Sequence, residues 1–149
     1  MSERAGIPLP RPTELSRPHW DGCREGELRY QRCRDCGASV FIPQPLCTSC
    51  FGSQLEWVAS SGRATVYSYT IVHRPQRPVF AVPYIVVIAE LAEGWHMLSN
   101  LIECDPADVA IGMPIEVVFR KMSDAVTLPY FRKSSRSEPQ ASEAHKGGA

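Results

Sequence analysis

Two Cys-x-x-Cys pairs are the residues of this sequence whose types and spacing point most directly to chemistry. Cys33 and Cys36 form the first pair, and Cys47 and Cys50 form the second after ten intervening residues. Each spacing is short enough to turn both sulfurs toward one point, and two such turns can close the tetrahedral four-thiolate cage of a structural Zn²⁺ site. All four sulfurs would then be ligands, which leaves no coordination position open for catalysis. The pattern therefore predicts one structural zinc ion per chain.

Three other uses of the cysteines compete with zinc: two disulfides, a redox Cys-x-x-Cys, and an iron site with the same four thiolates. Disulfides require an oxidising compartment, yet the first thirty residues contain prolines and charges and no apolar signal-peptide region. A thioredoxin-like motif begins a helix after a buried strand, whereas Cys33 follows the alternating, strand-like run 28–32. Zinc is therefore favoured. Gly37 and Gly52 follow the two pairs closely, where a sharp reversal makes positive φ useful.

No catalytic constellation stands out elsewhere in the sequence. Cys23 and Cys104 are left over, and such cysteines are more often small buried hydrophobes than nucleophiles. His73 ends a predicted strand beside Arg74 and Arg77, a place where a histidine is usually a hydrogen-bonded surface group. A Gly-x-Ser-x-Gly elbow and a Gly-rich phosphate loop are also missing. We therefore expect a protein that is not an enzyme by itself.

Length and charge narrow the class of protein. The chain has 149 residues, with 16 Lys and Arg against 16 Asp and Glu and a pI near 6.9, whereas nucleic-acid-binding domains are usually basic. The length suits one domain with a small module attached. The longest apolar run, residues 84–89, is too short to cross a bilayer. Free cysteines and the lack of a visible targeting segment suggest a cytoplasmic protein without membrane contact.

The cysteine pairs must be held by the elements on either side of them. Residues 1–26 are predicted to form an extended, proline-rich segment and a short helix, which Ser16 caps and Gly26 ends and which contains Trp20. Residues 27–55 are the predicted zinc ribbon. The ribbon has almost no apolar core, so metal coordination must supply most of its stability, on the order of 10–16 kcal/mol in zinc peptides.

From Glu56 to residue 133 the pattern becomes β-rich. Five runs have strand-like composition, and a helical turn separates the third from the fourth; the runs are 64–73, 84–91, 95–102, 115–121 and 128–132. This order fits a small closed barrel of the OB type, so the fold class is mainly β. Simple alternation in the first run places on one face the side chains of Tyr67, Tyr69, Ile71 and His73. Residues 134–149 have too few apolar groups to offset chain entropy and are predicted to be a disordered tail.

The loop 73–84 is the best candidate for a binding site. Three prolines lower the entropy that is lost when a partner docks, and Arg74 and Arg77 can meet phosphates. The loop also offers apolar surface from Val79, Phe80, Val82 and Tyr84. The same composition fits a rigid loop folded over the barrel mouth with solvated arginines. The residues by themselves favour neither interpretation.

Several ordered stretches of the chain resemble the zinc-ribbon/OB-fold family first catalogued as domain of unknown function 35. They are Trp20 before Gly26-Glu27-Leu28, both cysteine pairs, and residues 55–58, 61–70, 98–101, 111–117 and 128–131. The resemblance covers roughly residues 12–133, and the run of ordered motifs makes it specific. It implies an N-terminal helical segment, a rubredoxin-like zinc ribbon with the four cysteines as ligands, and an OB barrel.

The resemblance also implies a function. Members of this family are accessory subunits of thiolase-fold acyl-CoA enzymes, including ketothiolases and the aldolases that shorten steroid side chains. Some work beside a hot-dog-fold enoyl-CoA hydratase. The chain is therefore expected to bind acyl-CoA, to complete the partner's substrate channel, or both. Candidate contacts with acyl-CoA or the partner are Tyr69, Arg74, Arg77, Phe80 and Asn100, and further candidate partner contacts are Trp20 and Phe131.

A different class of function competes with this one. Zinc ribbons and OB barrels also bind single-stranded nucleic acid by aromatic stacking in basic grooves, and Tyr67 and Tyr69 on one strand can form such a platform. The balanced charge and the dispersed arginines argue against it. Salt separates the two hypotheses, because strand binding weakens steeply as salt rises, whereas an apolar protein contact depends on salt much less.

Overall fold

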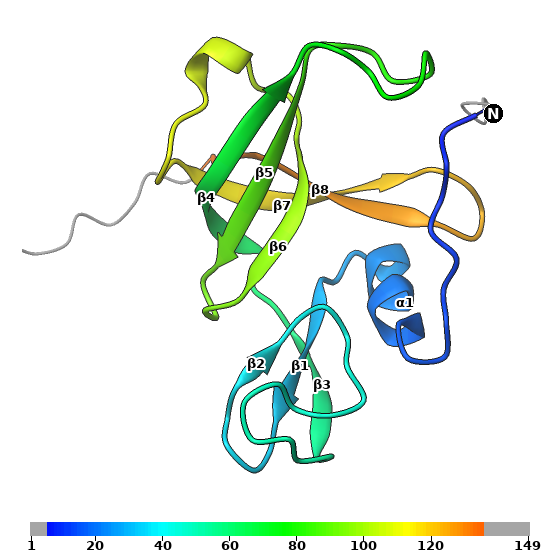
Figure 1. Cartoon of the computed structure of the whole chain (residues 1–149), viewed down its shortest axis with the longest axis vertical. Coiled ribbons are helices and arrows are strands. Elements are labelled where there is room, and N and C mark those ends of the chain that lie inside the picture. The colour runs from blue at the N-terminus through cyan, green and yellow to red at the C-terminus, as the bar shows by residue number, and fades with distance from the viewer. Residues whose placement is uncertain (1–5, 136–149) are drawn as a thin grey trace, which may run out of the picture.

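The computed structural model describes residues 6–135 and has three parts (Figure 1). A short helix, α1 (Arg17–Glu25), lies beside a three-stranded sheet whose connecting loops contain most of the paired cysteines, and a closed five-stranded barrel forms the other end of the molecule. The prediction of a mainly β protein with a helix, a ribbon and an OB-type barrel is confirmed. No helix in this described part is long and apolar enough to span a bilayer.

Helix α1 begins and ends where the sequence predicts, but its first turn is held differently. Ser16 occupies the N-cap position without a side-chain cap bond, and its Oγ instead accepts a hydrogen bond from the Thr13 N–H at 2.9 Å. Pro18 lies in the first turn, where its missing N–H has no cost. At the other end Gly26 adopts φ 79°, and its N–H donates to the Cys23 carbonyl. The buried residues of the helix are His19, Gly22 and Cys23.

The ribbon sheet is small and contains few apolar side chains. Strand β1 (Arg29–Cys33) lies between β2 (Ser39–Val40) and β3 (Leu55–Ala59), and both pairings are antiparallel. The predicted boundary at residues 55–56 falls inside β3. The ribbon's own core consists of Cys33, Val40 and Cys47, with Ala38 and Leu55 packed against them. So little apolar burial agrees with a module that depends on metal coordination.

The barrel closes in the strand order β4-β5-β6-β8-β7, with β7 pairing back onto β4. Its strands are β4 (Arg63–Val72), β5 (Tyr84–Leu91), β6 (His96–Leu101), β7 (Pro114–Lys121) and β8 (Thr127–Lys133). A 3₁₀ turn, η1 (Pro106–Asp108), lies between β6 and β7. The Asp105 carboxylate caps this turn by accepting a hydrogen bond from the Ala107 N–H at 2.8 Å, and the helical turn predicted between the third and fourth strands is confirmed.

The seam between β6 and β8 has the fewest paired residues of any strand pair in the barrel. These two strands run parallel and pair at Leu101 and Phe131. The Ile102 N–H donates to the Phe131 carbonyl at 2.8 Å, and the Ser99 hydroxyl donates to the Pro129 carbonyl at 2.6 Å. Beyond this seam the β7–β8 hairpin projects away from the barrel, toward α1 and the N-terminal segment (Figure 1).

A β-bulge in β4 corrects the predicted faces of that strand. The register with β5 shifts at Tyr67, which is the additional residue. After the bulge Tyr69 pairs with the fully buried Val87, and directly paired residues share a face. Tyr67 lies on the outer face instead, with its ring 4.6 Å from that of the exposed His96. The prediction that Tyr67 and Tyr69 share one face is wrong, because one extra residue reverses the alternation.

The ribbon and the barrel share one apolar core. Leu28 and Tyr30 are 1% exposed and belong to the same buried cluster as the inward-facing barrel residues. The Tyr30 ring stacks on Trp95 with the centroids 5.2 Å apart, and Phe41 packs against Trp95 at 4.7 Å. Tyr30 lies on β1, the strand that ends at Cys33. The metal-carrying strand therefore also contributes to the core of the barrel.

The turn between β5 and β6 fastens the linker that joins the two parts. The Glu93 carboxylate accepts hydrogen bonds from the Ser60 hydroxyl at 2.9 Å and from the Ser61 N–H at 2.6 Å. The Ser39 hydroxyl of β2 donates to the Glu93 carbonyl at 3.3 Å. Partial burial raises the pKa of Glu93, but the hydrogen bonds from Ser61 and Ser60 outweigh it and lower the pKa below its ordinary value. One residue thus connects the ribbon, the linker and the barrel.

Parts of the two predicted terminal segments lie outside the described residues. These are residues 1–5 of the extended segment and residues 136–149 of the predicted tail. Ser134, at the start of that tail, is described, and its N–H donates to the Pro114 carbonyl at 3.1 Å.

Candidate metal centre and surface groove

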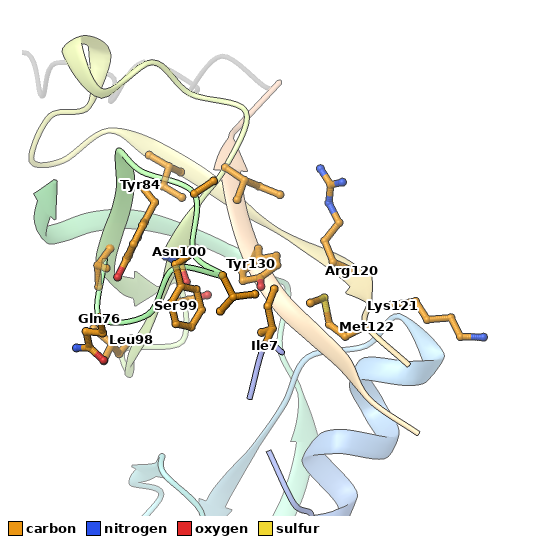
Figure 2. A pocket seen from close by; sticks show the side chains of 16 residues that line it. Ile7, Gln76, Tyr84, Leu98, Ser99, Asn100, Arg120, Lys121, Met122 and Tyr130 are labelled. Carbon is orange, nitrogen blue, oxygen red and sulfur yellow. The ribbon is translucent and has the colours of Figure 1, made fainter. Parts of the chain in front are cut away.

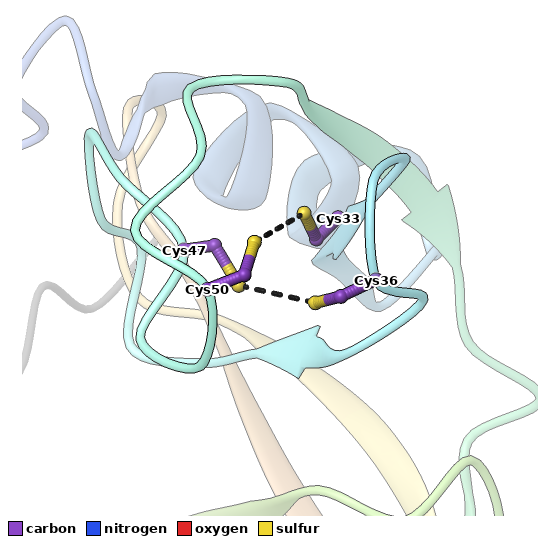
Figure 3. Close-up of side chains that lie close together, drawn as sticks. All are labelled: Cys33, Cys36, Cys47 and Cys50. Carbon is purple, nitrogen blue, oxygen red and sulfur yellow. Dashed lines mark hydrogen bonds between the residues drawn. The ribbon is translucent and has the colours of Figure 1, made fainter.

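The four cysteines of the two pairs meet at one point (Figure 3). The four Sγ atoms lie within 4.8 Å of one another, and the Cys33–Cys50 and Cys36–Cys47 pairs are each 3.6 Å apart. Around a tetrahedral Zn²⁺ with Zn–S bonds of about 2.3 Å, neighbouring sulfurs lie about 3.8 Å apart. The fold therefore positions four thiolates around a single metal ion, and this soft donor set fits the predicted Zn²⁺.

Tight backbone turns hold each cysteine pair. In the first turn Gly37 adopts φ 75°, and its N–H donates to the Cys33 carbonyl at 2.9 Å. In the second turn Phe51 occupies the equivalent position with φ 60°, a left-handed conformation that costs a non-glycine residue on the order of 1–2 kcal/mol. Gly52 is needed for a different reason than predicted. A Cβ at Gly52 would lie 2.5 Å from the Asp35 Oδ2 atom, so the position requires space rather than positive φ.

Backbone N–H groups in the second turn favour a thiolate at Cys47. The Cys50 and Ser49 N–H groups lower the pKa of the Cys47 thiol to about 6, and the Ser49 N–H donates to Cys47 Sγ at 3.4 Å. The Gly52 N–H lowers the pKa of Cys50, but the neighbouring cysteine sulfurs outweigh it and raise that pKa to about 12. The backbone donors of this turn thus favour the deprotonated thiolate state that a metal ligand requires.

A groove of about 770 Å³ lies on the outer face of the barrel, beside the seam of β6 and β8 (Figure 2). Side chains reach it from the loop after β4, from β5 and β6, from the β7–β8 hairpin, and from the N-terminal segment. Its apolar lining includes Ile7, Val79, Phe80, Val86, Leu98 and Met122, and its polar lining includes Gln76, Ser99, Asn100 and Tyr130. The groove is thus suited to a ligand with both apolar and polar parts.

Two cations of the hairpin also line the groove. In Figure 2 the Arg120 and Lys121 side chains point away from the other labelled residues. Arg120 pairs with Glu103 at 2.5 Å, and Lys121 pairs with Asp124 at 2.9 Å. Both pairs are largely exposed and hence weak. An anionic group of a ligand can compete with these carboxylates for the two cations.

The structure brings together two of the five residues predicted to contact acyl-CoA or a partner. Phe80 and Asn100 line the groove, where the Asn100 side-chain amide donates to the Ile85 carbonyl at 3.2 Å. Arg74 and Arg77 are exposed on the adjacent loop and do not line the groove. Tyr69 also lies outside the lining and is 37% exposed. The roles of all five in ligand binding stay predictions.

The two aromatic residues predicted to contact a partner differ in their exposure. Phe131 is 0% exposed and belongs to the barrel core, so the prediction that its side chain contacts a partner is wrong. Strand alternation by itself does not tell the inward face of a barrel from the outward face. Trp20 is half-buried, with its ring edge-on to His19 at 4.9 Å, and its partner contact stays a prediction.

Sequence reasoning missed part of the groove, because the missing residues come from segments far away along the chain. These residues are Ile7, Arg120, Lys121, Met122 and Tyr130. One signal in the sequence could have indicated that Tyr130 faces outward. Neighbouring residues of a strand face opposite sides, so Tyr130 must face outward if Phe131 faces the core. Which strand lies beside Tyr130 depends on the parallel seam, which local sequence does not reveal.

His19 and Cys23, one helical turn apart on α1, make a contact that resembles a catalytic pair. Cys23 Sγ lies 3.8 Å from His19 Nε2, and His19 Nδ1 lies 3.0 Å from the Arg29 carbonyl oxygen. Both side chains are buried, which raises the pKa of the Cys23 thiol to about 12 and lowers the pKa of His19. A protonated thiol without solvent access is inert, so Cys23 is a small buried residue, as predicted.

Comparison with known proteins connects this fold to a family. Family models described as "ChsH2, rubredoxin-like zinc ribbon domain" and "ChsH2, C-terminal OB-fold domain" match residues 20–56 and 57–120. A DUF35 domain-containing scaffold protein of Methanocaldococcus jannaschii is 36% identical over 95 residues, which cover 62% of this chain and 67% of that protein. The alpha subunit of 3-oxo-4,17-pregnadiene-20-carboxyl-CoA hydratase from Mycobacterium tuberculosis is 40% identical over 105 residues, covering 70% of this chain and 33% of that protein.

A solved structure agrees with these matches. The structure described as "Ltp2-ChsH2(DUF35) aldolase" aligns with a TM-score of 0.77 and 31% identity, over 84% of this chain and 98% of that chain. The chain spans about a third of the length of the hydratase alpha subunits that it matches, but about two thirds of the archaeal scaffold protein. The chain therefore belongs to the DUF35 family of scaffold proteins, with a ChsH2-type zinc ribbon and OB-fold barrel.

Proposed function

We propose that this chain is a non-catalytic accessory subunit that binds acyl-CoA, completes the substrate channel of a thiolase-fold enzyme, or does both. The partner would be a thiolase, ketothiolase or aldolase of lipid or steroid side-chain metabolism. The observation that carries the proposal is the outer groove of about 770 Å³, which joins an apolar lining to amide, hydroxyl and cationic groups. An acyl-CoA has matching parts, namely an apolar acyl chain, polar pantetheine amides and anionic phosphates.

The exposed arginines next to the groove support an anionic ligand. Arg74 and Arg77 lie on the proline-rich loop that also supplies Phe80 to the groove. A guanidinium binds phosphate through a fixed fork of donors, so these two residues suit the phosphates of CoA. The acyl chain would then lie against apolar residues of the groove such as Val86 and Leu98.

The chemical step would belong to the partner. In the described part of the chain, the cysteines of the metal centre are all ligands by geometry, and the His19–Cys23 contact is buried. The names of similar proteins support a chemical step in the partner. One is called a scaffold protein, and the name of the matched aldolase structure joins two proteins, Ltp2 and ChsH2. A hot-dog-fold enoyl-CoA hydratase is a further candidate partner, because hydratase alpha subunits contain a segment similar to this chain.

Single-stranded nucleic acid is the less supported ligand. The bulge in β4 separates Tyr67 from Tyr69, so these rings do not form a single stacking platform. The chain also carries 16 basic against 16 acidic residues, so no net positive charge favours a polyanion.

Affinity capture tests the proposal. The tagged chain would be used to capture proteins from a lysate of its own organism, and the bound proteins would be identified by mass spectrometry as salt is raised. We expect a thiolase-fold or hydratase subunit that stays bound. Recovery of nucleic acid that is lost as salt rises would instead support strand binding.

Titration of the captured complex with an acyl-CoA tests the ligand. Replacing both Arg74 and Arg77 with Ala is expected to weaken binding about fivefold, the scale of exposed charge pairs. The matched control is Arg63→Ala, because Arg63 is also exposed but begins β4 at the end opposite the loop. Equal affinity of the native complex and the double variant would remove the loop from the site.

A further inference from the structure

Phe51 combines backbone strain with exposure. It is a non-glycine residue with φ 60°, and its side chain is 76% exposed. Gly37 stands at the equivalent place after the first cysteine pair, and the turns are alike, since the Gly37 N–H donates to Cys33 O and the Phe51 N–H donates to Cys47 O. A glycine would therefore satisfy this turn without strain. The phenylalanine contributes neither to the turn nor to a buried core, so its presence calls for another reason.

The segment around Phe51 has the composition of an interface core. We call residues 41–54 the metal loop, because they contain Cys47 and Cys50. From residue 38 to residue 55 the sequence has no Asp, Glu, Lys or Arg, although 21% of the chain is charged. Ile42 is 70% exposed and Leu46 is 47% exposed within this loop. Depletion of charge together with exposed aromatic and large apolar side chains is typical of the centre of a protein interface.

The same composition disfavours anionic ligands. Nucleic acids and anionic membranes are bound through Lys and Arg, which the metal loop lacks. Four thiolates around one dication would add negative charge and repel phosphates further. A protein surface with an uncharged apolar pocket is the complementary partner. Because metal coordination and tight turns fix the loop, little conformational entropy would be lost on docking.

We propose that Phe51 is the anchor of a protein–protein contact through which the metal loop docks onto the thiolase-type or aldolase-type subunit. This inference rests on the proposed function, and it is favoured over self-association because the matched solved structure is named for two different proteins. It gives the zinc ribbon a role in assembly and leaves the groove on the barrel to the ligand. Phe51 fills an apolar pocket of the partner, and Ile42 and Leu46 add apolar contact around it.

The substitution Phe51→Gly tests the anchor, because folding and binding should respond in opposite directions. The variant is expected to keep one metal ion per chain and to be at least as stable as the native chain, since the strain is relieved. Its affinity for the purified partner subunit, measured by isothermal titration calorimetry, should fall at least tenfold. Ile111→Ser is the matched control, because Ile111 is also apolar and 64% exposed but lies far along the chain from the metal loop, in the turn before β7. The control should bind the partner within a factor of two of the native chain.

Each other outcome overturns a separate statement. If the native chain does not bind the partner subunit, the proposed function fails together with the inference. If the native chain binds and Phe51→Gly binds equally well, the inference alone fails. Asn also tolerates the left-handed conformation, so Phe51→Asn serves as a second variant. If Phe51→Gly or Phe51→Asn loses the metal or unfolds more easily than the native chain, Phe51 has a structural role and the inference fails. A native homodimer that Phe51→Gly converts to a monomer assigns the surface to a second copy of this chain.

Discussion

The zinc ribbon and the barrel are both small β-structures, but their cores differ in kind. The barrel surrounds a large apolar cluster that includes fully buried Val87, Ala89 and Phe131. The ribbon's own cluster contains Val40 and two metal-ligating cysteines, Cys33 and Cys47. Apolar burial therefore stabilises the barrel, whereas the ribbon needs the metal to offset the entropy of its turns.

The difference does not make the two parts independent. Tyr30, on the strand that ends at Cys33, stacks on Trp95, the residue just before β6 of the barrel. Glu93 accepts hydrogen bonds from the linker that joins the parts. Because β1 contributes to both cores, removal of the metal should weaken the barrel. A substitution that leaves the barrel folded should leave the metal cage closed, because the cysteines pack in the ribbon's own cluster.

The largest effect is expected from breaking the metal cage. Cys47→Ser removes one of the four sulfurs of the cage, so the variant should lose its metal and the ribbon should unfold. Metal content by mass spectrometry should fall from one ion per chain to nearly none. Cys104→Ser is the control, since Cys104 lies outside the cage, and it should keep the metal. Stoichiometric zinc in both Cys47→Ser and Cys33→Ser would refute the metal assignment.

A smaller effect is expected from opening a cavity in the barrel. Phe131→Ala removes a fully buried ring and should lower the free energy of unfolding by about 3–5 kcal/mol. Denaturant unfolding measures this loss, and metal analysis should still find one ion per chain, because Phe131 does not belong to the ribbon cluster. Loss of the metal at denaturant concentrations where the variant is folded would show that the barrel holds the cage.

The smallest effect is expected at the junction, where Glu93→Gln tests the coupling. The variant should lose about 1 kcal/mol of stability at neutral pH, the typical contribution of a hydrogen bond. The folded-state pKa of Glu93 is lowered, so its contribution is present above the unfolded-state pKa and is lost as the pH falls through the folded-state value. The native and variant unfolding curves should therefore converge below about pH 4.5.

Glu90→Gln is the matched control for the junction, because Glu90 is an exposed carboxylate at the end of β5, 4.0 Å from His96. We expect its stability to follow that of the native chain at neutral pH. The native chain and Glu93→Gln should differ less in free energy of unfolding at low pH than at neutral pH. An equal difference at both would mean that the carboxylate charge does not help to hold the linker.

Features that depend on short stretches of chain could be predicted from the sequence. The helix that ends at Gly26, the turn near Asp105 and the positions of the five barrel strands along the chain all follow from local propensity and turn chemistry. Features that depend on pairing between distant segments could not. The bulge at Tyr67 is set by the register with β5, and the burial of Phe131 is set by the closure of the barrel.

The sequence by itself determined the metal centre, because two Cys-x-x-Cys turns bring their own sulfurs together and need only one short loop to meet. It also determined the uncharged composition of the loop that carries Phe51. The tertiary structure alone decided the position of the groove. Its lining joins Ile7, Phe80, Asn100 and Tyr130 from segments that meet only when the barrel closes. The parallel pairing at Leu101 and Phe131 leaves no local trace in either strand.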